Sequence, residues 1–170
     1  VLDLEALANH RGSLFGAMPG GQPSQKLFDS RLAAALAALD PARPVAVEAE
    51  SSRVGTVTLP KQIWAAMQAA PVVELTASME DRISRILQDY AGFSRNSDLI
   101  AEILARLPRH ISKAQRADWL EIVRQGQTAA FVQSLIEVHY DPAYGRQGRR
   151  PIAHLPSYDV DALKQIVQSA

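Results

Sequence analysis

Short β-branched runs alternate with helical patterns in the first half of the chain, and this order most constrains the fold. Residues 44–50 and 71–76 are predicted strands, because each is rich in valine, begins at a proline and precedes a helical pattern. Residues 1–5 form a third candidate strand. Apolar residues recur at helical spacing over residues 24–39 and again over 60–69. Strands separated by helices favour an α/β fold with a parallel sheet.

The second half of the chain predicts helices only. Ser78 and Ser112 stand where N-caps are expected, Pro108 is placed to end a helix, and Gly126 to end the helix that Ser112 begins. Apolar stripes also indicate helices near residues 100–107, 131–138 and 163–167. Residues 140–156 read as a loop, since they include three prolines and two glycines. We expect an α/β domain over residues 1–92 and a helical subdomain over residues 93–170.

The composition excludes several classes of protein. There are no cysteines, so disulfides, cysteine-ligated zinc and a cysteine nucleophile within these 170 residues are excluded. Eighteen basic residues balance eighteen acidic ones, which gives no overall attraction to nucleic acid or membrane. No apolar run approaches the roughly 20 residues of a membrane helix, and the start has no signal-peptide pattern. We expect a cytoplasmic protein, and the opening at Val1 suggests a piece of a longer one.

A polar loop directly follows the first candidate strand. Asn9, His10, Arg11, Gly12 and Ser13 lie where ligands bind in a parallel α/β sheet, at the carboxyl end of a strand. An arginine can bind phosphate through two hydrogen bonds, and glycine lets backbone N–H groups approach the same anion. The alternative is an ordinary polar turn between a strand and a helix.

Two carboxylates end the second candidate strand. Glu48 and Glu50 are two residues apart and project from the same face of an extended chain. A carboxylate at the end of a buried strand needs a partner, and in phosphate-handling enzymes that partner is commonly Mg²⁺. The alternative is an ion pair with Arg53 or Arg11.

The helical half offers weaker candidates. Arg82 and Arg85 lie one helical turn apart and could bind phosphate, although such residues are more often simply solvated. A basic cluster that could contact RNA, or form a solvated face, comprises Arg106, Arg109, His110, Lys113 and Arg116. The rings of residues 139, 140 and 144 could stack on a base or pack on the core.

Three blocks of the sequence, residues 1–16, 22–28 and 47–55, resemble the C-terminal part of the bacterial tRNA 2-selenouridine synthases in order and spacing. The resemblance implies a transferase that replaces sulfur by selenium in the wobble 2-thiouridine of tRNA. It also implies selenophosphate as the selenium donor and an S-geranylated intermediate made from geranyl diphosphate. Family members join a rhodanese-like domain with an active cysteine to a P-loop domain.

The resemblance also implies a fold and a site. We expect a partial P-loop NTPase-like parallel sheet that lacks its first strand, followed by a helical subdomain, because neither the phosphate-binding loop nor the rhodanese-like domain is in this sequence. The chain alone is expected to be inactive. Glu50 would be the catalytic acid that orients Mg²⁺ or water. The implied phosphate- or tRNA-binding residues are Asn9, His10, Arg11, Gly12, Ser13, Gln25, Ser51 and Arg53.

Two rival functions stay open at this point. One is a kinase-like phosphotransferase, since residues 78–90 resemble the arginine-bearing helix of P-loop kinases. The other is a non-catalytic module that binds RNA or protein through residues 95–156.

Overall fold

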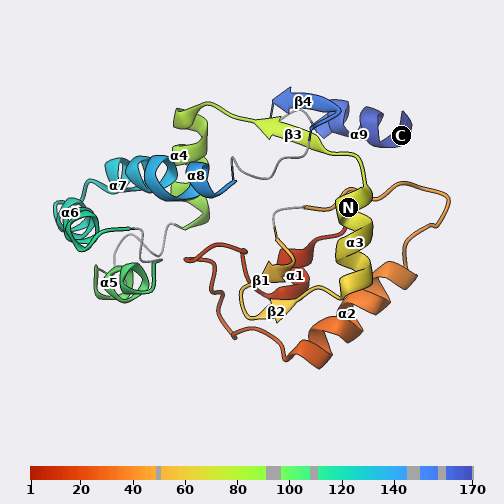
Figure 1. The fold of residues 1–170 in the computed structure, drawn as a ribbon, viewed down its shortest axis with the longest axis horizontal. Helices are drawn as coiled ribbons and strands as arrows, with labels where there is room; N and C mark the ends of the chain where they lie inside the picture. Colours follow the sequence, from red (N-terminus) through yellow and green to blue (C-terminus); the bar gives the residue numbers. More distant parts are fainter. Residues whose placement is uncertain (49–50, 91–96, 108–110, 145–149, 157–159, 170) are drawn as a thin grey trace. The chain divides into compact units, whose positions relative to one another are not determined.

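The computed structural model describes residues 1–48, 51–90, 97–107, 111–144, 150–156 and 160–169 (Figure 1). The chain forms two compact units: Val1–Leu75 with Pro151–Ala170, called the α/β unit below, and Thr76–Arg150, called the helical unit. The domain boundary expected between residues 92 and 93 lies outside the described residues and stays a prediction.

Each unit has its own set of elements. The α/β unit contains α1 (Leu4–Ala8), α2 (Gln25–Ala37), β1 (Arg53–Val54), β2 (Val57–Thr58), α3 (Lys61–Ala69), β3 (Val73–Thr76, which ends at the junction), β4 (Ala153–Pro156) and α9 (Val160–Ser169). The helical unit contains α4 (Met79–Asp89), α5 (Ser97–Ala105), α6 (Lys113–Arg124), α7 (Thr128–Leu135), the π-helix η1 (Ile136–Tyr140) and α8 (Asp141–Tyr144).

The parallel pairing expected between the first two strands is confirmed but short. Leu2 forms a parallel bridge with Val47, and the Leu2 N–H donates to the Ala46 carbonyl at 2.9 Å. The expectation of a strand through residue 5 is wrong, because the Asp3 carboxylate accepts from the Ala6 N–H at 2.8 Å and starts α1 at Leu4. Residues 49 and 50 lie outside the described residues.

The strand predicted over residues 71–76 is confirmed as β3, and it pairs with β4 in a small parallel sheet (Figure 1). The Ile152 N–H donates to the Val72 carbonyl at 2.7 Å, and His154 Nδ1 lies 2.7 Å from Glu74 Oε2. The loop expected over residues 140–156 is therefore wrong, since this stretch contains the end of η1, α8 and β4. Local turn residues could not reveal a partner about 80 positions away.

Helix starts are where the sequence placed them. Ser24, Ser78 and Ser112 each accept a hydrogen bond from the N–H three residues later, and α2, α4 and α6 begin at the next residue. Gly126 has a φ of +72° and its N–H donates to the Val123 carbonyl after α6, as the sequence predicted. Pro108, expected to end α5, lies outside the described residues.

The π-helix at the end of α7 has a local cause. Pro142 has no N–H, so it cannot donate to the carbonyl four residues earlier. The preceding turn is widened, and the Asp141 N–H donates to the Ile136 carbonyl, five residues back. Proline thus explains why this helix changes type instead of ending.

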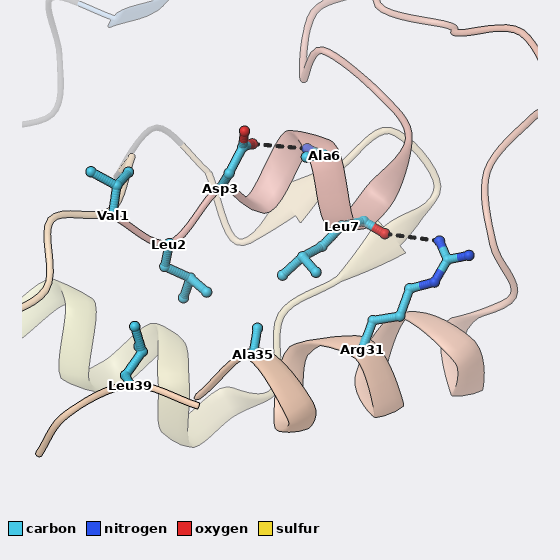
Figure 2. A pocket seen from close by; sticks show the side chains of 8 residues that line it. All are labelled: Val1, Leu2, Asp3, Ala6, Leu7, Arg31, Ala35 and Leu39. Atoms are coloured by element: carbon cyan, nitrogen blue, oxygen red, sulfur yellow. Dashed lines mark hydrogen bonds between the residues drawn. The ribbon is translucent and has the colours of Figure 1, made fainter. Parts of the chain in front are cut away.

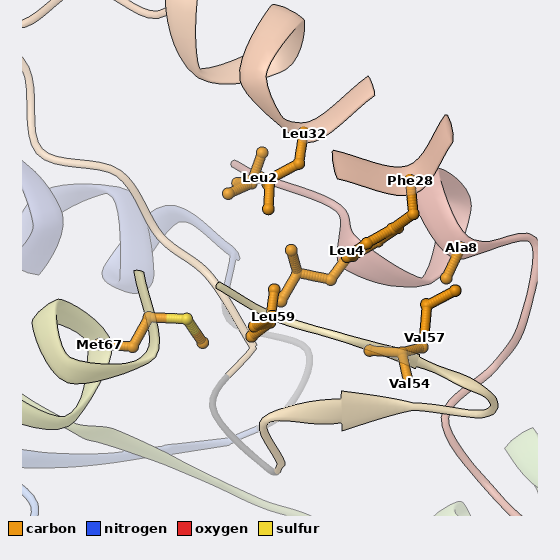
Figure 3. Packing of buried hydrophobic residues seen from close by; sticks show 9 residues of the cluster. All are labelled: Leu2, Leu4, Ala8, Phe28, Leu32, Val54, Val57, Leu59 and Met67. Atoms are coloured by element: carbon orange, nitrogen blue, oxygen red, sulfur yellow. The ribbon is translucent and has the colours of Figure 1, made fainter. Parts of the chain in front are cut away.

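A hydrophobic core joins α1, α2, α3 and the β1–β2 hairpin (Figure 3). Phe28 and Leu32 of α2 are almost fully buried, and Leu4 of α1 packs in the same cluster. The hairpin contributes Val54 and Val57, which face each other across its antiparallel register. The core thereby fixes the ends of the two segments that carry the candidate polar residues.

The helical unit has a separate core. Trp119 of α6 is fully buried, and its ring lies edge to face with that of Phe131 of α7, with 6.3 Å between the ring centroids. Its indole N–H donates to Ser134 Oγ at 2.9 Å. Ile100 and Leu104 of α5 are buried as the predicted stripe required. Across the part of the chain that the structure describes, no helix combines the length and the apolar character needed to cross a membrane.

Candidate functional site

The loop after α1 has a tightly folded backbone. Asn9 ends α1 with a φ of +47°, and Gly12 follows with a φ of +68°. His10 forms a bridge with Ala17, and the Arg11 N–H donates to the Gly16 carbonyl at 2.9 Å. The loop therefore returns on itself, and Arg11 and Ser13 are left partly exposed.

Asn9, one of the predicted binding residues, uses its side chain to hold this loop. Its amide Nδ2 donates to the carbonyl oxygens of Pro19 and Gly21, both at 2.9 Å. Asparagine also tolerates the left-handed conformation better than most residues. Both observations give Asn9 a structural task within the site.

His10 is the buried polar residue of the loop. Only 9% of its surface is exposed, and its Nδ1 atom has no hydrogen-bond partner among the described residues. Burial lowers the pKa of the imidazole below its ordinary value, because the charged form would lose its hydration. His10 is therefore neutral at physiological pH.

The β1–β2 hairpin presents Arg53. The backbone N–H of Arg53 donates to Ser51 Oγ at 3.1 Å, and its side-chain Nε donates to the Gly55 carbonyl at 2.8 Å. The guanidinium is thereby oriented, while its two terminal nitrogens form no hydrogen bond with any described residue. Arg53 is exposed and can bind an anion through those nitrogens. Glu50, the predicted catalytic acid, lies outside the described residues.

Gln22 joins the loop to the hairpin. Its Nε2 donates to the carbonyl oxygens of Ala8 at 3.3 Å and Val54 at 2.9 Å. Its Oε1 accepts from the Thr56 N–H at 2.7 Å and from the Thr56 hydroxyl at 3.0 Å. This role could not be recognised from the sequence, because residues 20–25 have the composition of a simple turn and the partners are up to 34 residues away.

Gln25, which the sequence did single out, also binds the hairpin. Its amide accepts from the Thr58 N–H at 2.9 Å and donates to the Thr58 carbonyl and to Asp29, both at 2.8 Å. These hydrogen bonds connect the first turn of α2 to β2. The structure therefore brings His10, Arg53 and Gln25 into one assembly, with Gln22 between the first two.

The arginines of α4 are occupied by carboxylates. Arg82 binds Asp141 and Arg85 binds Asp89. The hydrogen bond to Asp141 raises the pKa of the Arg82 guanidinium above its ordinary value. Each of these arginines therefore has a carboxylate partner within the helical unit, although the Arg85 side chain is 67% exposed.

Part of the predicted basic cluster has a structural task. Arg116 donates from Nη1 and Nη2 to the carbonyl oxygens of Ala105 and Leu107, at 3.2 and 3.0 Å, and so caps the end of α5. Arg106 and Lys113 are exposed, whereas Arg109 and His110 lie outside the described residues. Farther along the unit, the rings of His139 and Tyr140 are 4.9 Å apart and partly buried.

An open pocket of about 410 Å³ lies between α1 and α2 (Figure 2). Its walls are mainly apolar, with Leu2, Leu7 and Leu39 among the lining residues, and Arg31 donates to the Leu7 carbonyl at its edge. None of the predicted site residues lines this pocket. Within the described ranges, no group of three His, Cys, Asp or Glu residues could hold a metal ion.

Parallel pairing between strands that are separated by helices defines a partial P-loop-like α/β fold. The polar loop of residues 9–13 follows α1, so the expectation that it lies at the carboxyl end of a strand is wrong. Residues 1–97 match the family described as the tRNA 2-selenouridine synthase AAA domain. The chain belongs to the tRNA 2-selenouridine synthase family, as the sequence blocks predicted.

Curated relatives agree with this assignment. The tRNA 2-selenouridine synthase of Cupriavidus pinatubonensis is 31% identical over 91% of this chain and 50% of its own length. Those of Shewanella loihica and Pseudomonas syringae pv. tomato are each 32% identical, over 86% and 91% of this chain and 47% and 50% of their own lengths. The chain thus spans about half the length of these relatives. No solved structure matches it.

Proposed function

We propose that this chain is part of a tRNA-modifying transferase that replaces sulfur by selenium in the wobble 2-thiouridine of tRNA. The observation that carries the proposal is the family match over residues 1–97, which contain the loop, the hairpin and the glutamine that joins them. The relatives' printed name supplies the reaction class.

The proposed co-substrates are selenophosphate, the selenium donor, and geranyl diphosphate, the source of an S-geranylated intermediate. Both carry phosphate groups, and tRNA carries a phosphate backbone. Arg53, whose two terminal nitrogens form no hydrogen bond with any described residue, and the partly exposed Arg11 are suited to such anions. The neutral His10 adds no charge to the site.

Glu50 keeps its proposed role as the acid that orients Mg²⁺ or water. Since the relatives are about twice as long, we propose that the phosphate-cradling loop and a rhodanese-like domain lie in their remaining half. On this proposal, the 170-residue chain alone does not selenate tRNA.

The test uses the intact protein, tRNA that contains 2-thiouridine, and selenophosphate, with nucleosides quantified by mass spectrometry. We expect selenouridine with the unaltered protein, and none with Arg11→Ala or Glu50→Ala at unchanged thermal stability. Lys61→Ala, an exposed change at the start of α3, is the matched control and keeps activity. An inactive unaltered protein refutes the function, whereas active Arg11 and Glu50 variants refute the site assignment. Nucleotide hydrolysis without tRNA would support the phosphotransferase instead.

A further inference from the structure

Gln22 has a place in the molecule that neither the family match nor the predicted site assigns to it. We propose that Gln22 is a positioning residue, which sets the spacing between the loop of His10 and Arg11 and the hairpin of Arg53. The inference rests on the proposed function only in taking these two segments as the walls of one anion-binding site. The inference adds to that site the residue whose hydrogen bonds connect the two segments.

The first argument is that every hydrogen-bonding capacity of the Gln22 amide is used. A primary amide has two N–H donors and two acceptor lone pairs. Gln22 donates to Ala8, at the end of α1, and to Val54 of β1, and it accepts twice from Thr56. An ionised glutamate lacks both donors and a leucine lacks all four groups, so no natural side chain of similar size reproduces this set.

The second argument is the close packing around Gly55. A Cβ atom on this residue would lie 2.2 Å from Gln22 Oε1 and 2.8 Å from His10 Cδ2. Gln22, His10 and the hairpin turn are therefore closely packed around Gly55. A displacement of the Gln22 side chain must move the imidazole or the hairpin backbone.

The third argument links this packing to Arg53. Gln22 binds the residues on both sides of Gly55, and the Gly55 carbonyl accepts the hydrogen bond that orients the Arg53 guanidinium. Gln22 thus fixes the peptide that aims the arginine, although it does not contact the arginine itself. Loss of Gln22 should therefore weaken anion binding, whereas the hairpin itself should still form.

The experiment compares Gln22→Leu and Gln22→Glu with Ser24→Ala in the intact protein. Ser24 caps α2 two residues later, so its loss lowers stability, while its own side-chain bond is to the Leu27 N–H and not to the loop or the hairpin. Measured quantities are thermal stability, the KM for selenophosphate and kcat. At a temperature where all variants are folded, we expect Gln22→Leu to raise KM about tenfold with a smaller change in kcat. Gln22→Glu keeps the two bonds from Thr56 but turns a carboxylate oxygen toward the Ala8 and Val54 carbonyls and adds negative charge, so its KM should rise at least as much.

Equal KM values for Gln22→Leu and Ser24→Ala would overturn the inference and leave Gln22 a purely structural residue. If Gln22→Leu does not fold, Thr56→Val decides, since it removes only the 3.0 Å hydroxyl bond; an unchanged KM then overturns the inference. If the unaltered protein does not selenate tRNA, the proposed function fails, and binding of inorganic pyrophosphate is measured instead. Weaker pyrophosphate binding by both Gln22→Leu and Arg53→Ala would still support the positioning role, and unchanged binding would refute it.

Discussion

Arg82 of α4 donates from both terminal nitrogens of its guanidinium to the carboxylate of Asp141, 59 residues later, at the first position of α8. The pair connects two helices of the helical unit beside the π-helix. Both side chains are partly exposed, at 34% and 47%, so water weakens the attraction.

We expect a coupling free energy of about 0.5–1 kcal/mol between Arg82 and Asp141, near the upper end for exposed pairs because two hydrogen bonds form. A double-mutant cycle of Arg82→Ala and Asp141→Asn, followed by urea unfolding, measures it. Arg85 and Asp89, an exposed pair within α4, serve as the comparison and should couple by roughly 0.3–0.5 kcal/mol. A smaller coupling for Arg82 than for Arg85 would contradict the expectation.

Gly55→Ala should destabilise the protein more than Gly126→Ala does. Both glycines have positive φ values, +60° and +72°, which cost other residues roughly 1–2 kcal/mol. Gly126 has open space around its missing side chain, whereas Gly55 faces Gln22 and His10. Overpacking should therefore add about 1–3 kcal/mol at Gly55. Chemical denaturation of the two variants tests this prediction. Equal losses of unfolding free energy would show that the Gln22 and His10 side chains can move aside at little cost.

Ser134→Ala should lower the free energy of unfolding by about 1–3 kcal/mol, because it leaves the buried indole N–H of Trp119 without its acceptor. Ser30→Ala is the matched control, since the Ser30 hydroxyl donates to the Lys26 carbonyl on an exposed face of α2. Its effect should stay within about 0.5 kcal/mol. Urea unfolding followed by Trp fluorescence reports both values. A loss at position 134 no larger than that at position 30 would mean that the indole finds another partner.

The stability of the protein should decrease as the pH falls from neutral through the ordinary pKa range of histidine. Burial lowers the pKa of His10 in the folded state, so the unfolded chain binds a proton first and gains free energy from it. We expect His10→Phe to flatten this part of the profile. The check is the difference between the urea unfolding profiles of the two proteins at pH 5.5 and 7.5, and parallel profiles would refute the role of His10.

Local features of the fold were the easier to predict, whereas of the distant pairings the sequence predicted the parallel bridge between Leu2 and Val47 but not the β3–β4 sheet. The N-caps at Ser24, Ser78 and Ser112 were predictable because a cap and its partner are three residues apart. The β3–β4 sheet was missed because its second strand lies among prolines and glycines that signal a loop. The strand expected at the start was shortened by a single aspartate, whose capping bond favours a helix.

The candidate site divides in the same way. Residue type pointed to the loop of Arg11 and to the hairpin of Arg53, since cations and glycines after strands suit anions. The spatial link between them could not be found, because a glutamine in a turn has no distinctive pattern and its partners are remote in sequence. The burial of His10 was equally invisible, as it depends on the packing of Gly55.

The α/β unit is assembled from two stretches of chain that are separated by the whole helical unit. During synthesis, residues 76–150 leave the ribosome before Ala153–Pro156 can add β4 to β3. The helical unit is one continuous segment, so it can complete its fold first, as domains do when they emerge in order. The nascent α/β unit must meanwhile keep an unpaired edge on β3, a strand whose Leu75 is exposed even in the complete fold. Ribosome pausing within residues 76–150 would therefore lengthen the interval in which this protein is most open to aggregation.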